Sequence, residues 1–135
     1  MPDIKIFNPD GLARPAGTYT HVAHAKTQQV VFIAGQVPMD ASGNTVGKDD
    51  FEAQCAQVYT NIHIALRSVG ADWNNVVQFT SYLVRPQDAA AFRAYRGREF
   101  PKMFPGGAYP PNTLLIISRL ADEAYLLEVQ TVAAL

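Results

Sequence analysis

The feature that most constrains the fold is a set of apolar runs that are too short to be core helices. Val30 to Ala34 are apolar at consecutive positions. Because a half-exposed strand alternates apolar and polar residues, this run predicts a strand covered on both faces and central in its sheet. Val76 to Val84 predicts a second such strand, with Val77, Phe79 and Leu83 on one face and Val76, Tyr82 and Val84 on the other.

Only two segments have helical periodicity. In the first, apolar residues recur at three- and four-residue steps from Phe51 to Val69. Asp49 to Glu52 has the form of a capping box, and Gly70 suits a left-handed C-terminal cap. The second helix is predicted from Gln87 to Phe100, between two prolines. Its inner stripe is expected to consist of Ala91, Phe92 and Tyr95.

The remaining periodic segments predict strands. Tyr19 to Lys26 and Gln29 to Gln36 flank Thr27-Gln28 and are predicted to pair as a hairpin. An earlier strand is indicated by the alternation of Ile4 and Ile6, and two later strands by Thr113 to Arg119 and Tyr125 to Ala133. The predicted order is β-β-β-α-β-α-β-β, an α+β fold with two helices on one face of a mixed β-sheet and a single domain over residues 1–135.

This arrangement leaves one face of the sheet without a cover. Two helices can pack on only one side, yet several strands are apolar on both sides. Large exposed apolar surfaces usually mark interfaces, and soluble oligomers are mostly closed and symmetric. The sequence therefore predicts a homo-oligomer.

Charge and composition disfavour several classes of function. The chain has 135 residues, a formal charge of −1 and a pI near 6.3, so it lacks the basic surface that nucleic acids require. No apolar run approaches the roughly 20 residues that cross a bilayer. The single cysteine, Cys55, cannot form an internal disulfide, and the N-terminus does not have the pattern of a signal peptide. We expect a cytoplasmic protein that binds neither nucleic acid nor membrane.

Several segments, taken in order, resemble the Rid (reactive intermediate deaminase, YjgF-like) family. Pro15 to His21 resembles its Gly-Pro-Tyr-Ser-Gln signature, Ala34 to Asp40 its Ser-Gly-Gln-Ile-Pro segment, and Gln54 to Leu66 its first helix. Pro110 to Leu120 resembles its Pro-Ala-Arg-Ser segment and the Arg-Leu-Pro that follows. Leu127 to Gln130 resembles its final Glu-hydrophobe-Glu, with glutamine in place of the second acid.

The resemblance implies a chorismate-mutase-like fold assembled as a trimeric barrel of sheets, with three ligand clefts between subunits. It also implies a chemistry, the hydrolysis of enamines or imines to a keto compound and ammonia without a metal or an organic cofactor. We therefore expect a homotrimer that binds a small molecule in intersubunit clefts and needs no cofactor.

Hydrolysis of a C=N bond requires a group that orients water and moves protons. Glu128 shares a face with Gln130 in an otherwise apolar strand, and it matches the acidic water-orienting residue of the family. It is the predicted catalytic residue. The alternative is a carboxylate at a wet seam between subunits.

The family's carboxylate-binding arginine should fall at position 112, where this chain has Asn112. An amide offers neither the charge nor the two-pronged geometry of a guanidinium. Loss of one partner of a desolvated charge pair costs roughly 2–5 kcal/mol, which is on the order of 30- to several-thousand-fold in affinity. Small α-imino acids are therefore expected to bind poorly, unless Arg119 or an arginine of a neighbouring subunit enters the cleft.

Other candidates for the site have structural alternatives. Tyr19 matches a signature tyrosine, but it would equally suit packing at a strand start. His21 could carry a proton or lie at the surface. His24 and His63 are expected to be structural, no metal site is proposed, and Asn61 is expected to brace a loop of another subunit. The substrate-binding set predicted by the resemblance is Tyr19, His21, Gly35, Gln36, Asn112, Thr113 and Gln130.

Four functions remain open at this stage. The leading hypothesis is a Rid-type hydrolytic deaminase of an enamine or imine that is not a small α-imino acid. A second is a non-catalytic trimer whose clefts bind a metabolite and regulate a partner, which Asn112 favours. A third is a 2-iminobutanoate/2-iminopropanoate deaminase. The fourth, an endoribonuclease or translation inhibitor, is disfavoured by the slightly acidic charge.

Overall fold

The computed structural model describes residues 2–135 and confirms the predicted order of strands and helices. A short 3-10 turn, η1, is added before the fourth strand. The elements are β1 (Asp3–Phe7), β2 (Val22–Lys26), β3 (Val30–Gln36), α1 (Phe51–Ser68), η1 (Trp73–Asn75), β4 (Val76–Leu83), α2 (Asp88–Met103), β5 (Asn112–Ile116) and β6 (Leu127–Ala134).

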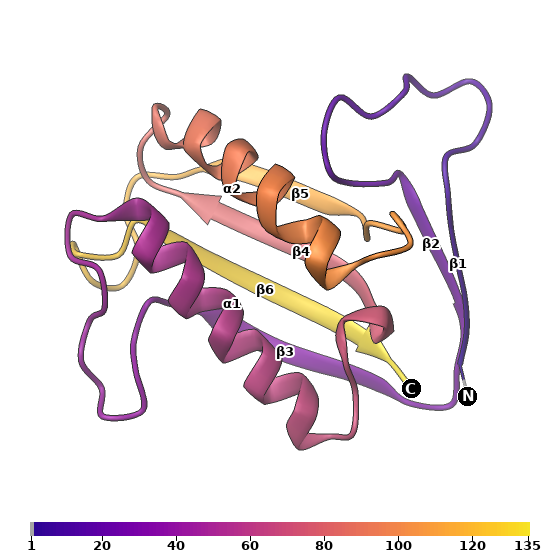
Figure 1. Cartoon of the computed structure of the whole chain (residues 1–135), viewed down its shortest axis with the longest axis horizontal. Coiled ribbons are helices and arrows are strands. Elements are labelled where there is room, and N and C mark those ends of the chain that lie inside the picture. The colour runs from indigo at the N-terminus through magenta and orange to yellow at the C-terminus, as the bar shows by residue number, and fades with distance from the viewer. Residues whose placement is uncertain (1) are drawn as a thin grey trace.

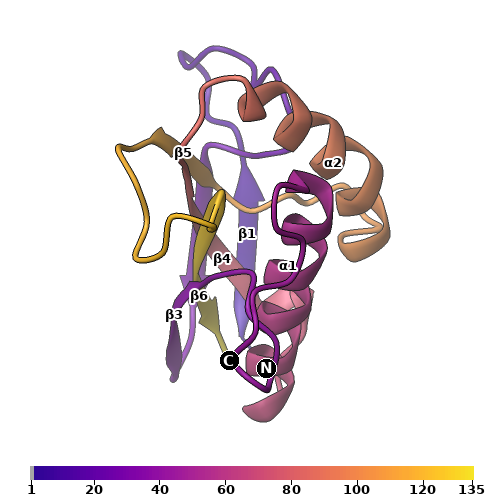
Figure 2. The same ribbon diagram turned by 90° about the vertical axis from the view of Figure 1, so that its left-hand side faces the viewer.

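The core of the fold is a four-stranded mixed sheet in the order β3-β6-β4-β5. β6 runs antiparallel to both of its neighbours, whereas β4 and β5 are parallel and are connected through α2. Figure 2 shows both helices of residues 2–135 as a layer on one side of this sheet, and neither lies on the other side. The predicted α+β architecture, with two helices on one face of a mixed sheet, is therefore confirmed.

The predicted hairpin between the second and third strands is wrong. β2 instead pairs antiparallel with β1, with Ile4 opposite Ala25, and the two form a separate hairpin beside the main sheet (Figure 1). The connection after β2 is tied to the C-terminus, because Thr27 Oγ1 donates to the Leu135 carbonyl and Leu135 N donates to the Gln29 carbonyl. These bonds hold the segment around Thr27-Gln28, the predicted turn of the hairpin, against the C-terminus.

The prediction that Val30 to Ala34 is a central strand is also wrong. β3 lies at an edge of the sheet and pairs only with β6. Ile33 is buried against the helices, but Val30 is 51% exposed and Phe32 78% exposed on the other face. The consecutive apolar residues therefore reflect one face covered by helices and one apolar face left bare within the subunit.

The helix predictions are largely confirmed. The N-cap of α1 is Asp50, whose carboxylate accepts from Ala53 N at 3.0 Å, one residue after the start of the predicted Asp49–Glu52 capping box. Gly70 has the left-handed conformation (φ 77°) expected after the end of the helix. α2 continues past Pro101 to Met103. Ala91 was expected in its inner stripe but is exposed, because the buried positions follow Phe92 at helical spacing. The buried residues of α2 are Asp88, Phe92, Tyr95, Arg96 and Phe100.

The strand after η1 contains an irregularity that changes which face two residues occupy. Val76 and Phe79 are both buried, although an odd number of positions separates them. The register with β6 shifts between Val76 and Gln78, which turns Val76 inward and Val77 outward. Val77 was expected on the same face as Phe79, so this part of the prediction is wrong.

Neither helix in residues 2–135 has the length and apolar character of a membrane span.

Candidate functional site

The two faces of β6 have different chemistry. Leu127, Val129 and Thr131 point toward the helices and are buried. The alternate residues, Glu128 and Gln130, point to the uncovered face, since successive side chains of a strand lie on opposite sides. The two polar side chains thus share a face, as predicted.

The Glu128 side chain lies directly over the backbone of Gly35 at the end of β3. A Cβ atom added at position 35 would overlap the carboxylate and lie 2.6 Å from Glu128 Cδ. Only glycine permits this approach. On the other side, Tyr82 of β4 is the cross-strand partner of Glu128. Sequence analysis did not select Tyr82, whose only signal was its position on the face opposite Phe79.

Polar and apolar residues surround Glu128 on the uncovered face. Thr80 of β4 lies opposite Gln130, and Thr113 of β5 continues the same row across the sheet. Leu115, in the row of Tyr82, is 43% exposed. Thus one acid and several hydrogen-bonding groups lie within an apolar surface. This composition is typical of a ligand site completed by a second surface.

Asn112 does not lie beside Glu128 within the subunit. It pairs with Phe79, a residue that faces the helices, and its Oδ1 accepts a 2.7 Å hydrogen bond from the buried Ser81 hydroxyl. Glu128 belongs to the opposite face and pairs with Tyr82, three residues farther along β4. Within one subunit the two side chains therefore do not share a cavity, and their meeting in a cleft between subunits stays a prediction.

Arg119 does not replace the missing arginine within the subunit. Its guanidinium donates to the Leu120 and Ala121 carbonyls and pairs with Glu123 at 3.5 Å. Among residues 2–135, no ion pair includes Glu128.

One arginine is buried where sequence analysis did not anticipate it. Arg96 is 6% exposed, with its guanidinium over the Phe92 ring at 4.5 Å. Its Nε and Nη1 have no hydrogen-bond partner among the described residues, and burial lowers its pKa. It belongs to the helix layer and is therefore separated by the sheet from Glu128.

Tyr19 and His21 lie together in the segment between β1 and β2. Their rings meet edge to face with centroids 5.9 Å apart. His21 Nε2 lies 2.6 Å from the Ala13 carbonyl oxygen, and His21 N donates to Asn8 Oδ1. His21 also lines a hollow with Gln78 and residues of β2. Within the subunit, these contacts hold the loop and bring neither ring to Glu128.

The predicted pair Gly35 and Gln36 borders a second hollow, at the side of α1. Gln36 Nε2 donates to the carbonyl of Ala34 on its own strand. Asn61 was expected to brace a loop of another subunit. It instead braces a loop of its own subunit, donating to the Val37 and Met39 carbonyls at 3.1 and 2.9 Å.

Gln54 has a structural role that sequence analysis identified only as part of a motif. It is fully buried, and its amide donates to Gly47 O and Ala124 O. Its Oε1 accepts from Leu126 N at 2.8 Å. Gln54 therefore holds the segment that leads into β6 and thereby supports the position of Glu128.

The remaining candidates are structural. His63 stacks on Trp73 and contacts Asp72 at 3.1 Å. Cys55 is fully buried on α1, and burial raises the pKa of its thiol, so it behaves as a small apolar residue. Among the residues described, no cluster of His, Cys, Asp and Glu side chains has the arrangement of a metal site.

Comparison with known proteins decides the family. The family model described as Endoribonuclease L-PSP matches residues 11–135. This chain belongs to that family, the Rid (YjgF) family. The RutC family protein slr0709 from Synechocystis is 31% identical over 133 residues, which cover 98% of this chain and 97% of the relative. The RutC family protein PH0854 from Pyrococcus horikoshii is 30% identical over 129 residues, which cover 96% of each.

A solved structure supports the same assignment. The crystal structure of YyfB from Yersinia pestis, a Rid-family protein of unknown function, superposes with a TM-score of 0.87. It is 29% identical in sequence, and 98% of each chain is covered. The resemblance inferred from the sequence is thus confirmed for the family and the fold.

Proposed function

We propose that this Rid-family protein hydrolyses a reactive imine or enamine that lacks a small α-carboxylate, with Glu128 orienting the attacking water. The observation that carries the proposal is the position of Glu128. Its carboxylate lies on the uncovered face, against the Gly35 backbone, and has no basic partner among residues 2–135 of its own subunit. Such a carboxylate is free to accept a proton from water and to hold a protonated imine nearby.

The site is completed by a neighbouring subunit. Within one subunit Asn112 and Glu128 lie on opposite faces of the sheet and on strands that flank β4. Only a second subunit can bring the sheet edge that carries Asn112 next to the sheet face that carries Glu128. The exposed apolar residues Val30, Phe32 and Leu115 on that face support such packing. We therefore propose a homotrimer with three composite clefts, in which Tyr19, His21, Gln36 and Thr113 are candidate contacts to the substrate.

The substrate class follows from Asn112. Its side-chain oxygen already accepts from Ser81, and an amide cannot supply the positive charge that a carboxylate needs when it leaves water. An imine without a carboxylate carries no such requirement. We therefore expect little preference for 2-iminopropanoate or 2-iminobutanoate.

The test compares two imine classes under one protocol. An amino-acid oxidase generates 2-iminopropanoate in one reaction, and an amine oxidase generates a carboxylate-free imine in the other. Semicarbazide traps the imine that survives, and ammonia is measured in parallel. We expect the protein to accelerate loss of the carboxylate-free imine more than loss of 2-iminopropanoate. Equal acceleration of both, or acceleration of 2-iminopropanoate alone, would refute the proposed specificity.

Substitution at position 112 tests the reason for that specificity. Asn112→Arg is expected to gain hydrolysis of 2-iminobutanoate by roughly 30-fold or more. Asn112→Gln is the matched control, because it lengthens the side chain without adding charge, and it should show no gain. A folded Asn112→Arg protein that behaves like Asn112→Gln would show that position 112 does not contact the substrate.

A second candidate function is a non-catalytic trimer that binds a metabolite. The Ser81–Asn112 hydrogen bond favours it, since position 112 is then a structural residue rather than a binding group. This candidate predicts saturable binding of carboxylate-free ketones in the clefts without acceleration of any imine. Ligand binding measured by calorimetry, together with the trapping assay, separates the two functions.

A further inference from the structure

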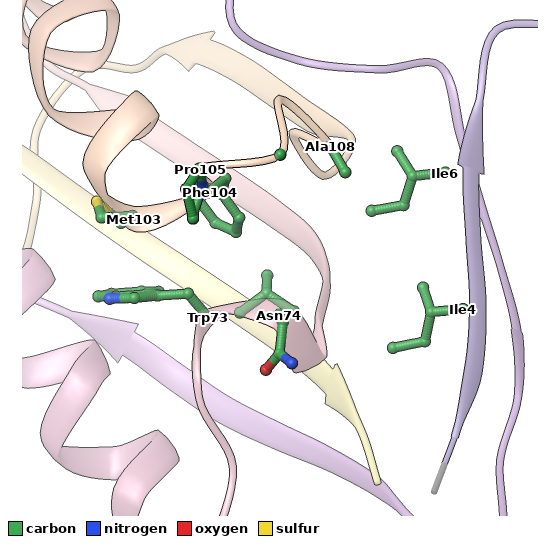
Figure 3. A pocket seen from close by; sticks show the side chains of 10 residues that line it. Ile4, Ile6, Trp73, Asn74, Met103, Phe104, Pro105 and Ala108 are labelled. Atoms are coloured by element: carbon green, nitrogen blue, oxygen red, sulfur yellow. The ribbon is translucent and has the colours of Figure 1, made fainter.

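A cavity of about 340 Å³ separates the β1–β2 hairpin from the body of the subunit (Figure 3). Ile4 and Ile6 of β1 point into it from one side. The opposite side is lined by Trp73 and Asn74 of η1 and by the loop from Phe104 to Ala108. None of the candidate residues around Glu128 or Asn112 lines this cavity, so it is distinct from the proposed cleft.

The cavity is large compared with an ordinary packing defect. Protein interiors contain few voids larger than a water molecule. This volume instead falls in the range of about 300–1,000 Å³ that is typical of small-ligand sites. Ile4 and Ile6 point toward the body of the subunit, yet both remain only half-buried. The hairpin is thus held away from the apolar surface that it could otherwise cover.

The chemistry of the walls defines the class of ligand. No charged side chain of the described residues 2–135 lines the cavity. Trp73 presents an aromatic wall: its ring stacks on His63 at a centroid distance of 5.1 Å and is tilted against Phe104 at 6.1 Å. Asn74 contributes an amide to the lining. A neutral, planar, largely apolar molecule fits these walls, whereas an ion would lose its hydration without compensation.

Two segments border the opening. One is the hairpin, which belongs to a sheet separate from the main one. The other is the loop that contains Gly106 and Gly107. Gly107 has a φ of 73°, and a Cβ atom at Gly106 would meet nothing within 4 Å. Space therefore remains on the Gly106 side for a ligand to enter.

We propose that this cavity binds a neutral aromatic small molecule, which packs on Trp73 between the hairpin and the loop after α2. The site is independent of the proposed hydrolytic cleft. Binding of a ligand in this cavity therefore does not depend on whether the protein is a deaminase.

The only tryptophan of the chain, Trp73, makes the test direct. The probe is N-phenyl-1-naphthylamine, a neutral aromatic dye that accepts energy from tryptophan. Titration of the intact protein should quench Trp73 emission saturably at about one dye per chain. Ile6→Glu should weaken binding by at least about tenfold, because it introduces a charge into the apolar wall. Phe7→Glu is the matched control on the same strand, and it should bind like the wild type because Phe7 does not line the cavity.

A second pair of variants covers the case in which Ile6→Glu disturbs the hairpin. Gly106→Phe places a ring at the opening without backbone strain and should also reduce binding. Gly17→Phe, at another glycine with open space around it, should not. The proposal is overturned if the wild type shows no saturable quenching, as expected if another subunit fills the cavity. It is also overturned if Ile6→Glu and Gly106→Phe bind as tightly as their controls, since the dye would then occupy the bare sheet face.

Discussion

The covered and bare faces of one four-stranded sheet have different properties, although their residues alternate along the same strands. On the covered face, Phe79 and Val129 are about 99% and 100% buried against the helices. On the bare face, Phe32 is 78% exposed and Glu128 lies half-buried over Gly35. The first face therefore stabilises the subunit. The second leaves an apolar surface and a carboxylate available to a neighbour and a ligand.

This difference follows from the two-residue period of a strand. A change of one position along β6 moves a side chain from the helix layer to the opposite face. Substitutions at adjacent positions of a strand should therefore affect different properties. On the covered face they should change the stability of the subunit, and on the bare face they should change its assembly or its activity. The predictions that follow test this division, beginning with the largest expected effect.

Removal of an aromatic ring from the covered face should destabilise the subunit most. Phe79→Ala is expected to lower the free energy of unfolding by about 3–5 kcal/mol, because a cavity replaces a ring packed against Tyr59, Phe100 and Phe104. Urea denaturation at two protein concentrations measures the loss, which should be similar at both. A loss below about 1 kcal/mol would contradict the assignment of this face as the core.

A charge on the bare face should affect assembly and leave the fold intact. Phe32→Glu is expected to weaken association of subunits by at least about tenfold, because a carboxylate would be buried without a partner. Light scattering after size exclusion measures the mass, and circular dichroism checks the fold. Ile64→Glu is the matched control, at an apolar residue on α1 that is 64% exposed. If both variants or neither dissociated, the bare face would not be the interface.

The smallest effect concerns the buried arginine of the helix layer. Arg96→Met should raise the free energy of unfolding by about 1 kcal/mol, since it removes two unpartnered donors and keeps the apolar stem. The lost contact between the guanidinium and Phe92 offsets part of the gain. Thermal unfolding shows whether the substitution stabilises or destabilises the protein. Destabilisation would mean that Arg96 has a partner in the assembled protein.

The sequence predicted the features that depend on local periodicity. The first helix is an example, since its acidic start, its apolar stripe and the Gly70 that follows its end all lie within one segment. The pairing of strands depends on distant partners. Bonds from the Thr27–Gln29 connection to Leu135 could not be read from the hairpin pattern, and the edge position of β3 depends on where β6 inserts.

The site was predicted less completely for a related reason. Glu128 and Gln130 are two residues apart on one strand, so their shared face follows from the period of the strand. Asn112 was located by resemblance, which aligns positions but does not state the direction of a side chain. Its inward direction depends on its pairing with Phe79 and its bond to Ser81, both of which are distant in sequence.

The most direct test of the central claim is the effect of Glu128→Gln on loss of the carboxylate-free imine in the trapping assay. Glutamine keeps the size of the side chain over Gly35 but cannot accept a proton from water at neutral pH. The account predicts a rate at least about a hundredfold lower, whereas Glu123→Gln, at an exposed carboxylate paired with Arg119, keeps the wild-type rate. Equal rates for the two variants would contradict the claim that the bare face carries the chemistry.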